Sequence, residues 1–81
     1  MSVFIYGFNF SHTSNNKVMD ANLHSEVSSS LPTGSSGSVY DGLHIDFGSQ
    51  TIDAYYFSGS LTAGEITTLS GVLAAHSGTE G

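Results

Sequence analysis

The beginning of the chain is a nearly unbroken run of large apolar side chains. Residues 3–10 read VFIYGFNF, and such aromatic and β-branched residues favour a strand. Successive side chains of a strand point to opposite faces. One face is aromatic and holds Phe4, Tyr6, Phe8 and Phe10. The other face holds the smaller residues Val3, Ile5, Gly7 and Asn9. Because both faces are largely apolar, we predict a central strand or one that a neighbour covers.

The next apolar pattern has a helical period. Leu23, Val27 and Leu31 recur every four residues, which predicts a short helix. Asp20 is placed to cap its beginning, and Pro32 ends it because proline has no backbone N–H to donate. A connector rich in glycine and serine follows at residues 33–38.

The middle of the chain predicts extended structure. Residues 39–40 and the alternating segment 43–47 flank Asp41-Gly42, a dipeptide that favours a hairpin turn because both positions tolerate positive φ. Gly48-Ser49 then leads into a strand at residues 51–57, and the short connections predict antiparallel pairing. The residues expected to face inward are Leu43, Ile45 and Phe47.

The last element is the most completely specified. Thr62 and Glu65 have the spacing of a capping box, and Leu61 before it with Ile66 after it fits a hydrophobic staple. A helical stripe follows, formed by Ile66, Leu69, Leu73 and His76 with Val72 beside it. We expect Gly78 to end the helix and Gly71 to mark a close approach by another backbone.

These elements predict one α+β domain over residues 1–81. Its small antiparallel sheet consists of the N-terminal strand and a hairpin, packed against a short helix and a C-terminal helix. The 81 residues include no cysteine, so disulfides and thiolate metal sites are excluded. Small domains often need such a staple or a partner, which leaves either an efficient core or a neighbouring chain as the source of stability.

Charge narrows the classes of partner. The net charge is −6 and Lys17 is the single basic residue. Binding to nucleic acid requires several cations against phosphates, so we expect no nucleic-acid partner. Anionic membranes are disfavoured for the same reason, and no apolar run approaches the ~20 residues that span a bilayer. The apolar start lacks the basic region and cleavage site of a signal peptide.

Candidate chemistry is sparse. His44 and Asp46 lie two apart on one strand face and form a possible pair of metal ligands, but zinc needs three or four that converge. We expect no cofactor and no catalytic residues, because no nucleophile elbow or other catalytic motif occurs. Asp46 and Asp53 are expected to oppose each other across the hairpin. His76 is interpreted as a histidine of the last helical turn, favourable near the negative end of the helix dipole.

The aromatic residues are the candidate functional surface. Core and subunit interface are both open readings for Phe4, Tyr6, Phe8, Phe10 and Tyr55, since interfaces are enriched in tyrosine and phenylalanine. We expect loss of Tyr6 and Phe8 to weaken self-association. Loss of Val3 and Ile5, on the opposite face, is expected to unfold the domain. Which face is the core stays open at this point.

The C-terminal third resembles a pattern found in short bacteriophage virion-associated proteins. The pattern is a strand that ends in an aromatic residue, then L-T-x-x-E, a leucine stripe and a closing A-A-H. The matching residues are Phe57, Leu61, Thr62, Glu65, Leu69, Leu73, Ala74, Ala75 and His76. The chain departs from it with Ser70-Gly71, where aspartate is common. The resemblance implies a non-enzymatic structural protein of the virion, in the capsid, neck or tail.

Two functions follow as hypotheses. In the first, the chain is made in the host cytoplasm and located in the virion, where it forms homo-oligomers and binds other virion proteins. In the second, it is a small acidic binding module or inhibitor that engages a basic protein partner.

Overall fold

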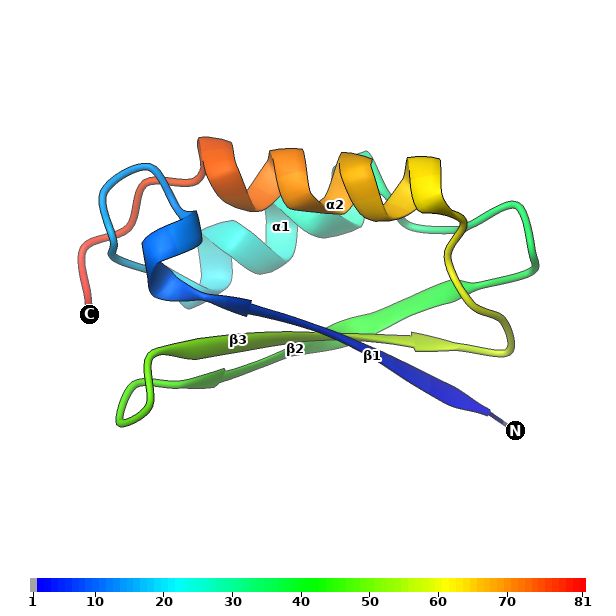
Figure 1. Cartoon of the computed structure of the whole chain (residues 1–81), viewed down its shortest axis with the longest axis horizontal. Coiled ribbons are helices and arrows are strands. Elements are labelled where there is room, and N and C mark those ends of the chain that lie inside the picture. Colours follow the sequence, from blue (N-terminus) through cyan, green and yellow to red (C-terminus); the bar gives the residue numbers. More distant parts are fainter. Residues whose placement is uncertain (1) are drawn as a thin grey trace.

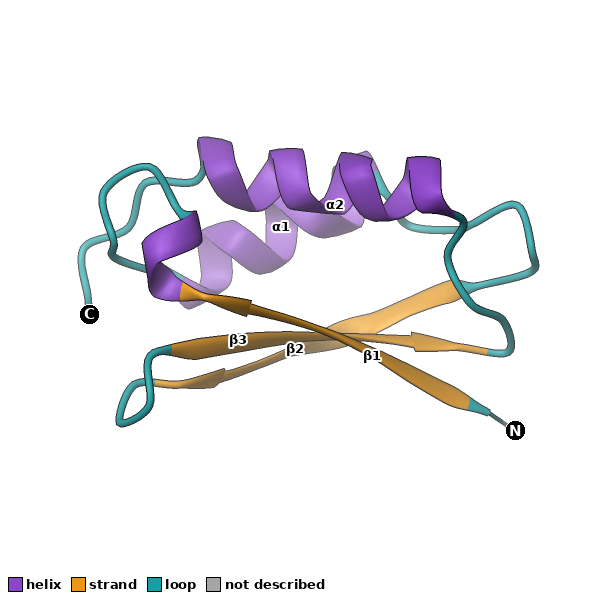
Figure 2. Cartoon of the chain, viewed as in Figure 1, coloured by secondary structure: helices purple, strands orange, loops and turns teal. Residues whose placement is uncertain are grey.

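A three-stranded antiparallel sheet carries both α-helices on one of its faces (Figure 1). This computed structural model describes residues 2–81. Figure 2 shows the two layers, with the helices above and the strands below. The elements in chain order are β1 (Val3–Asn9), a 3-10 turn η1 (Phe10–His12), α1 (Asp20–Ser30), β2 (Val39–Asp46), β3 (Thr51–Phe57) and α2 (Ala63–Ala75). The predicted α+β class is confirmed.

The sheet order is β1-β3-β2, so the central strand is β3. Three of its side chains, Ile52, Ala54 and Tyr56, are fully buried. The prediction of a central N-terminal strand is therefore wrong, because β1 lies at an edge. The two apolar faces of β1 are instead explained by a helix layer on one side and an exposed apolar surface on the other.

Asp41-Gly42 does not form a hairpin turn. The register pairs Tyr40 with Tyr56 and Gly42 with Tyr55, which leaves Asp41 as the extra residue of a β-bulge. Gly42 has φ +140°, so the glycine serves a bulge here. β2 runs through the bulge because the apolar residues on both sides of it pair with β3, and the chain reverses at residues 47–50.

The bulge also changes which residues face each other. His44 lies opposite Asp53, and Asp46 lies opposite Thr51, so the predicted opposition of Asp46 and Asp53 is wrong. Asp46 instead closes the reversal by accepting the backbone N–H groups of Gly48 (2.9 Å) and Ser49 (3.2 Å). Hydrogen bonds from Ser49 and Gly48 lower the pKa of the Asp46 carboxyl, because they favour its charged form.

The first helix follows its predicted stripe but begins differently. Leu23 and Val27 are fully buried and Leu31 is 7% exposed. The residue before the helix is Met19, which provides no side-chain cap. Asp20 is therefore the first helical residue, where its charge still favours the positive end of the dipole.

The second helix begins as predicted. The Thr62 hydroxyl accepts the Glu65 N–H (3.3 Å), and the Glu65 carboxylate accepts the Thr62 N–H (2.8 Å), which completes a capping box. Leu69 and Leu73 are fully buried, whereas Ile66 is 37% exposed. The predicted stripe is thus confirmed at its leucines.

Two glycine predictions are wrong. The helix ends at Ala75, before Gly78, and a side chain at Gly71 would meet no atom within 4 Å. The close approach occurs at Gly78, where an added Cβ would collide with the Val18 backbone. The C-terminal segment can therefore lie directly against residues 14–18.

The helix layer covers the aromatic face of β1. Phe10 is 1% exposed, and Tyr6 and Phe8 pack against the core. Val3 and Ile5 are 49% and 55% exposed, so the core face of β1, which the sequence left open, is the aromatic one, and the expectation that loss of Val3 and Ile5 unfolds the domain loses its basis. Burying the aromatic face removes more apolar area from water than burying a face that includes Gly7 and Asn9.

Tyr56 connects the two sides of the sheet within the core. Its hydroxyl donates to the Leu31 carbonyl (2.8 Å), and its ring lies 6.0 Å from Tyr6 of β1 and 5.5 Å from Tyr40 of β2. Burial raises the pKa of Tyr56 to about 12. The core therefore spans all three strands through one aromatic residue.

Candidate functional site

The outer edge of β1 offers unpaired backbone groups. Phe10 N–H donates to the Gln50 carbonyl and Ser58 N–H donates to the Ser2 carbonyl, both at 2.9 Å. These bonds extend the β1–β3 ladder at each end, so the even-numbered residues of β1 bond to β3. The odd-numbered residues direct their N–H and C=O groups outward. In the described chain, no strand lies beyond β1.

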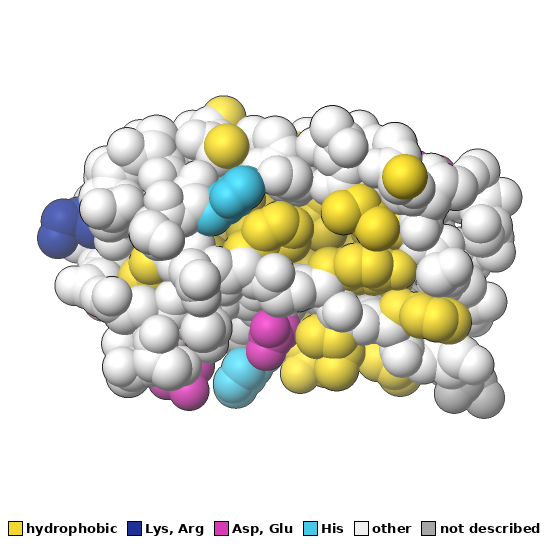
Figure 3. All heavy atoms as spheres, viewed as in Figure 1, with side chains coloured by type: hydrophobic (Ala, Val, Ile, Leu, Met, Phe, Trp, Pro, Cys, Tyr) yellow, Lys and Arg dark blue, Asp and Glu magenta, His cyan; other side chains and the backbone are white. Residues whose placement is uncertain are grey.

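The surface around the first part of this edge is apolar, whereas Asp53 adjoins its second part at Gly7. We define the β1 flank as the free edge together with Val3 and Ile5 on the open face of the sheet and Phe4, Tyr6 and Phe8 on the helix side. These side chains range from half-buried to exposed. Figure 3, viewed as in Figure 1 with β1 and α2 in front, shows apolar side chains gathered between α2 and β1 and continuing below the strand.

The open face of the sheet divides into an apolar and a polar half. Cross-strand rows run from β1 through β3 to β2. The apolar rows are Val3–Phe57–Val39 and Ile5–Tyr55–Gly42, and the polar rows are Gly7–Asp53–His44 and Asn9–Thr51–Asp46. A hollow of about 230 Å³ in the polar half is lined by Gly7, Phe8, Asn9, Thr51 and Asp53. The apolar half therefore adjoins the first part of the β1 edge.

The β2 edge is protected in several ways. Tyr40 N–H donates to the Pro32 carbonyl (2.9 Å), and Thr33 forms a bridge with Val39. The bulge interrupts the strand at Asp41. Bulges, covering loops and edge charges are the devices by which natural sheets prevent edge-to-edge pairing. β1 carries no charge, no proline and no bulge.

Glu65 fastens the loop that covers β2. Besides capping α2, its carboxylate accepts the Ser35 N–H (2.6 Å). The backbone bonds from Thr62 and Ser35 lower the pKa of the Glu65 carboxyl. One carboxylate therefore joins the beginning of α2 to the connector between α1 and β2.

The predicted aromatic surface is split by the fold. Phe4, Tyr6, Phe8 and Phe10 face the helices, and Tyr55 lies on the open face beside Ile5. Phe10 is too deeply buried to contact a partner. A role in an interface stays a prediction for the other four.

The pairing of the buried His76 with Glu26 was not apparent from the sequence. His76 is 1% exposed, its Nδ1 lies 2.8 Å from Glu26 Oε1, and its Nε2 accepts the Met19 N–H at 3.0 Å. Because Nε2 accepts, the proton of the neutral ring is on Nδ1 and is donated to Glu26. His76 lies at the end of α2 as predicted, but Glu26 is fifty positions away, so no spacing in the sequence indicates the pair.

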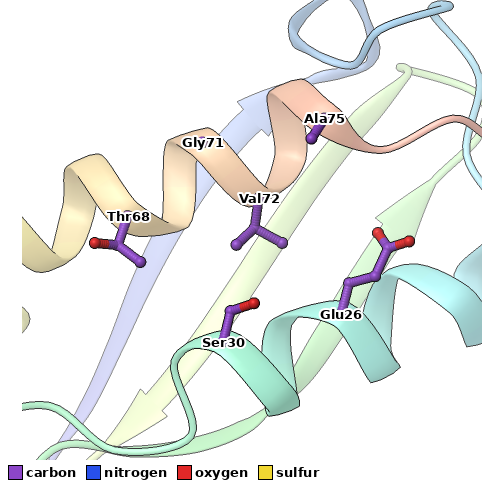
Figure 4. Close-up of a pocket in the computed structure, with 6 residues that line it drawn as sticks. All are labelled: Glu26, Ser30, Thr68, Gly71, Val72 and Ala75. Atoms are coloured by element: carbon purple, nitrogen blue, oxygen red, sulfur yellow. The ribbon is translucent and has the colours of Figure 1, made fainter.

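Figure 4 shows a groove between α1 and α2, with Val72 pointing into it from one helix and Ser30 and Glu26 from the other. Its volume is about 440 Å³. The residues that line it are mostly small, namely Glu26, Ser30, Thr68, Gly71, Val72 and Ala75. The ring nitrogens of His76 beside it are both engaged, so this histidine has no lone pair with which to activate a nucleophile.

The histidines and carboxylates do not gather into a metal site. His44 lies across from Asp53, while Asp46 is engaged in its own turn. Within residues 2–81, no group of three histidine, cysteine, aspartate or glutamate side chains is placed to hold a metal ion. Over the same residues, neither helix is long and apolar enough to cross a membrane.

Comparisons with protein-family models, curated proteins and solved structures found no match. The contrast between the two edges of the sheet is therefore the main guide to function.

Proposed function

We propose that this protein is a non-catalytic structural subunit of a phage-like particle, such as a capsid decoration, neck or tail accessory protein. It binds other protein chains of the particle, copies of itself or other virion proteins, through the β1 flank. The observation that carries the proposal is the unprotected edge of β1 in a sheet whose other edge is protected. An open edge with exposed apolar side chains is an aggregation hazard unless something covers it.

The charge of the chain fits a protein that assembles at a defined place. A net charge of −6 keeps copies apart in general. The β1 flank bears no charge, so apolar contact there is least opposed. Burying an apolar side chain contributes about 1.5–3 kcal/mol, and the flank offers several of them.

The resemblance of the C-terminal third supports the same class of function. Leu69 and Leu73 of the matching pattern form the buried stripe of α2, and Thr62 and Glu65 form its cap. These residues build the layer that supports β1 from above (Figure 1). The resemblance implies a virion protein, and the β1 flank supplies a surface by which such a protein binds.

The proposal is tested by banding particles from the source organism in a density gradient. We expect mass spectrometry to find the chain in the particle band, and an Ile5→Lys copy to be lost from it. Val39→Lys places the same charge on the same face at the other edge and should be retained. Absence of the wild-type chain from every particle band would overturn the proposal.

The second function, an acidic binding module for a basic partner, is favoured by the opposite side of the molecule. The pKa of Tyr40 is raised first by its burial, then by Tyr56, and then by Asp20 and Asp41, so the two carboxylates lie near one ring. Salt-sensitive binding of a basic protein that is lost in Asp20→Asn and Asp41→Asn, but kept in Ile5→Lys, would favour this function.

A further inference from the structure

We infer that the partner of the β1 edge is β1 of a second copy, paired antiparallel about a two-fold axis to form one six-stranded sheet. This inference deepens the proposed function and rests on its assignment of β1 as the binding edge. The outward N–H and C=O groups of Val3, Ile5, Gly7 and Asn9 call for an extended strand, because only a strand presents partners at the same spacing.

The strand is complementary to itself. With the seven residues in full overlap, Val3 lies opposite Asn9 of the second copy and Ile5 lies opposite Gly7. The odd-numbered residues of both copies then exchange backbone hydrogen bonds, as the parity of the β1–β3 ladder requires. On the helix side, Phe4 meets Phe8 of the second copy, an aromatic cross-strand pair.

The same symmetry places both helix layers on one face of the joined sheet. An axis perpendicular to the sheet keeps each α2 above its own β1, as Figure 1 shows for one copy. The two α2 helices then flank the seam between the copies. The apolar groups that α2 and the helix side of β1 bring to this arrangement are Ile66, 37% exposed, and the half-buried Phe4, Tyr6 and Phe8.

Charge favours a second copy over a basic partner at this edge. Six of the seven carboxylates lie outside β1 and β3, namely Asp20, Glu26, Asp41, Asp46, Glu65 and Glu80. Asp53 is the single exception, on the central strand. A basic partner would find its counter-charges elsewhere on the molecule, whereas two copies meet here with the least repulsion.

The pairing edge is the full length of β1, seven residues. Because the isologous contact uses the same patch on both copies, it closes as a dimer and leaves no open edge at the seam.

Sedimentation equilibrium of the wild-type chain and two matched variants tests the inference. Val3 and Val39 lie opposite the same residue, Phe57, from the two sides of β3. They are 49% and 47% exposed, so a lysine at either position makes the same change of charge. We expect a dimer for wild type and Val39→Lys, and a monomer for Val3→Lys. A wild-type monomer at millimolar concentration, or equal loss of dimer in both variants, would overturn it.

Disulfide mapping tests the register, since the chain has no cysteine of its own. Opposite residues in a hydrogen-bonded antiparallel pair lie about 5.5 Å apart at Cα, within the range that a disulfide spans. We expect a mixture of Val3→Cys and Asn9→Cys copies to cross-link to each other far more than either does alone. Equal or absent cross-linking would overturn the full-overlap register.

Failure of this inference is distinguishable from failure of the proposed function. If the chain is monomeric yet bands with particles and loses them on Ile5→Lys, another virion protein supplies the strand, and only the inference fails. If the dimer forms as described but the chain never bands with particles, the virion assignment fails and the β1 pairing stands.

Discussion

The two edges of this sheet differ in how well they are protected against pairing with another strand. Pro32 and Thr33 bond to β2, the bulge at Asp41 interrupts its ladder, and charged residues lie along it. β1 has seven paired residues without a charge, proline or bulge, and within residues 2–81 no strand pairs with its outer backbone groups. Both strands belong to one small sheet, so the contrast cannot be explained by fold class.

The contrast shows that each edge of a sheet is protected separately from the other. Protection of the β2 edge prevents another strand from pairing there. The connector before β2 is long enough to fold back over its strand, and Glu65 holds the connector in place. Within residues 2–81, no strand pairs with the outer edge of β1. Self-association through β1 and protection of β2 together would yield a closed dimer instead of an open fibre.

The largest expected effect on stability comes from truncating Tyr56, the core residue that both edge strands contact. Tyr56 contacts Tyr6 on one side and Tyr40 on the other. Tyr56→Ala should lower the free energy of unfolding by about 3–5 kcal/mol, the usual cost of truncating a buried aromatic residue. Urea denaturation measures it, and Tyr56→Phe serves as the milder control. A loss below ~1 kcal/mol would mean that the two edges do not share a core.

The next largest effect is a difference in stability between substitutions on the two faces of β1. Phe8 packs against the core, so Phe8→Ala should cost about 2–3 kcal/mol, less than for a fully buried phenylalanine. Ile5 is 55% exposed, so Ile5→Ala should change the stability of the monomer by ~0.5 kcal/mol or less. Denaturation at micromolar concentration gives both values. The reverse order would show that Ile5, and not Phe8, faces the core.

The bulge of β2 is tested by a pair of glycines. Gly42 has φ +140°, so Gly42→Ala should destabilise by about 1–2 kcal/mol. Gly71 lies in α2 with open space where a Cβ would be, so Gly71→Ala should stabilise by about 0.5–1 kcal/mol. Thermal melts of the two variants should shift in opposite directions. A stabilised Gly42→Ala variant would show that the bulge does not require its glycine.

These residues also show what the sequence predicts and what it leaves open. The helices were predictable because apolar period and capping chemistry are local, as with Leu23, Val27, Thr62 and Glu65. Asp41-Gly42 was misread because the dipeptide states only that positive φ is tolerated. Whether that residue ends a strand or bulges within it depends on the pairing of the residues on both sides with β3, which is not local.

Less of the candidate site than of the helices could be predicted from the sequence. Alternation divides β1 into Phe4, Tyr6 and Phe8 on one face and Val3 and Ile5 on the other, but it does not show which face the helices cover. The edge position of β1 depends on strand order, and the protection of β2 depends on where Pro32 and Ser35 fold back. The chemistry was visible in the sequence, but its placement required the fold.

The smallest effect concerns the carboxylate that fastens the β2 edge. Because the pKa of Glu65 is lowered in the folded state, its charge stabilises the fold fully above the unfolded value of about 4.3. That contribution is lost as the pH falls through the lower folded-state pKa. Wild type should therefore lose more stability between pH 6 and pH 3 than Glu65→Gln, whose amide does not titrate.

Thr62→Ala is the matched control for this comparison. It removes the neutral half of the capping box and should cost ~1 kcal/mol, with no change in ionisation at position 62. Its curve of stability against pH should be offset from that of wild type with nearly the same slope, because the backbone bonds from Thr62 and Ser35, the main causes of the lowered Glu65 pKa, remain, whereas the Glu65→Gln curve should be flatter. Hydrogen exchange at Ser35 N–H, whose acceptor is Glu65, should also quicken in Glu65→Gln. Parallel curves for wild type and Glu65→Gln would show that the charge of Glu65 does not hold the loop over β2.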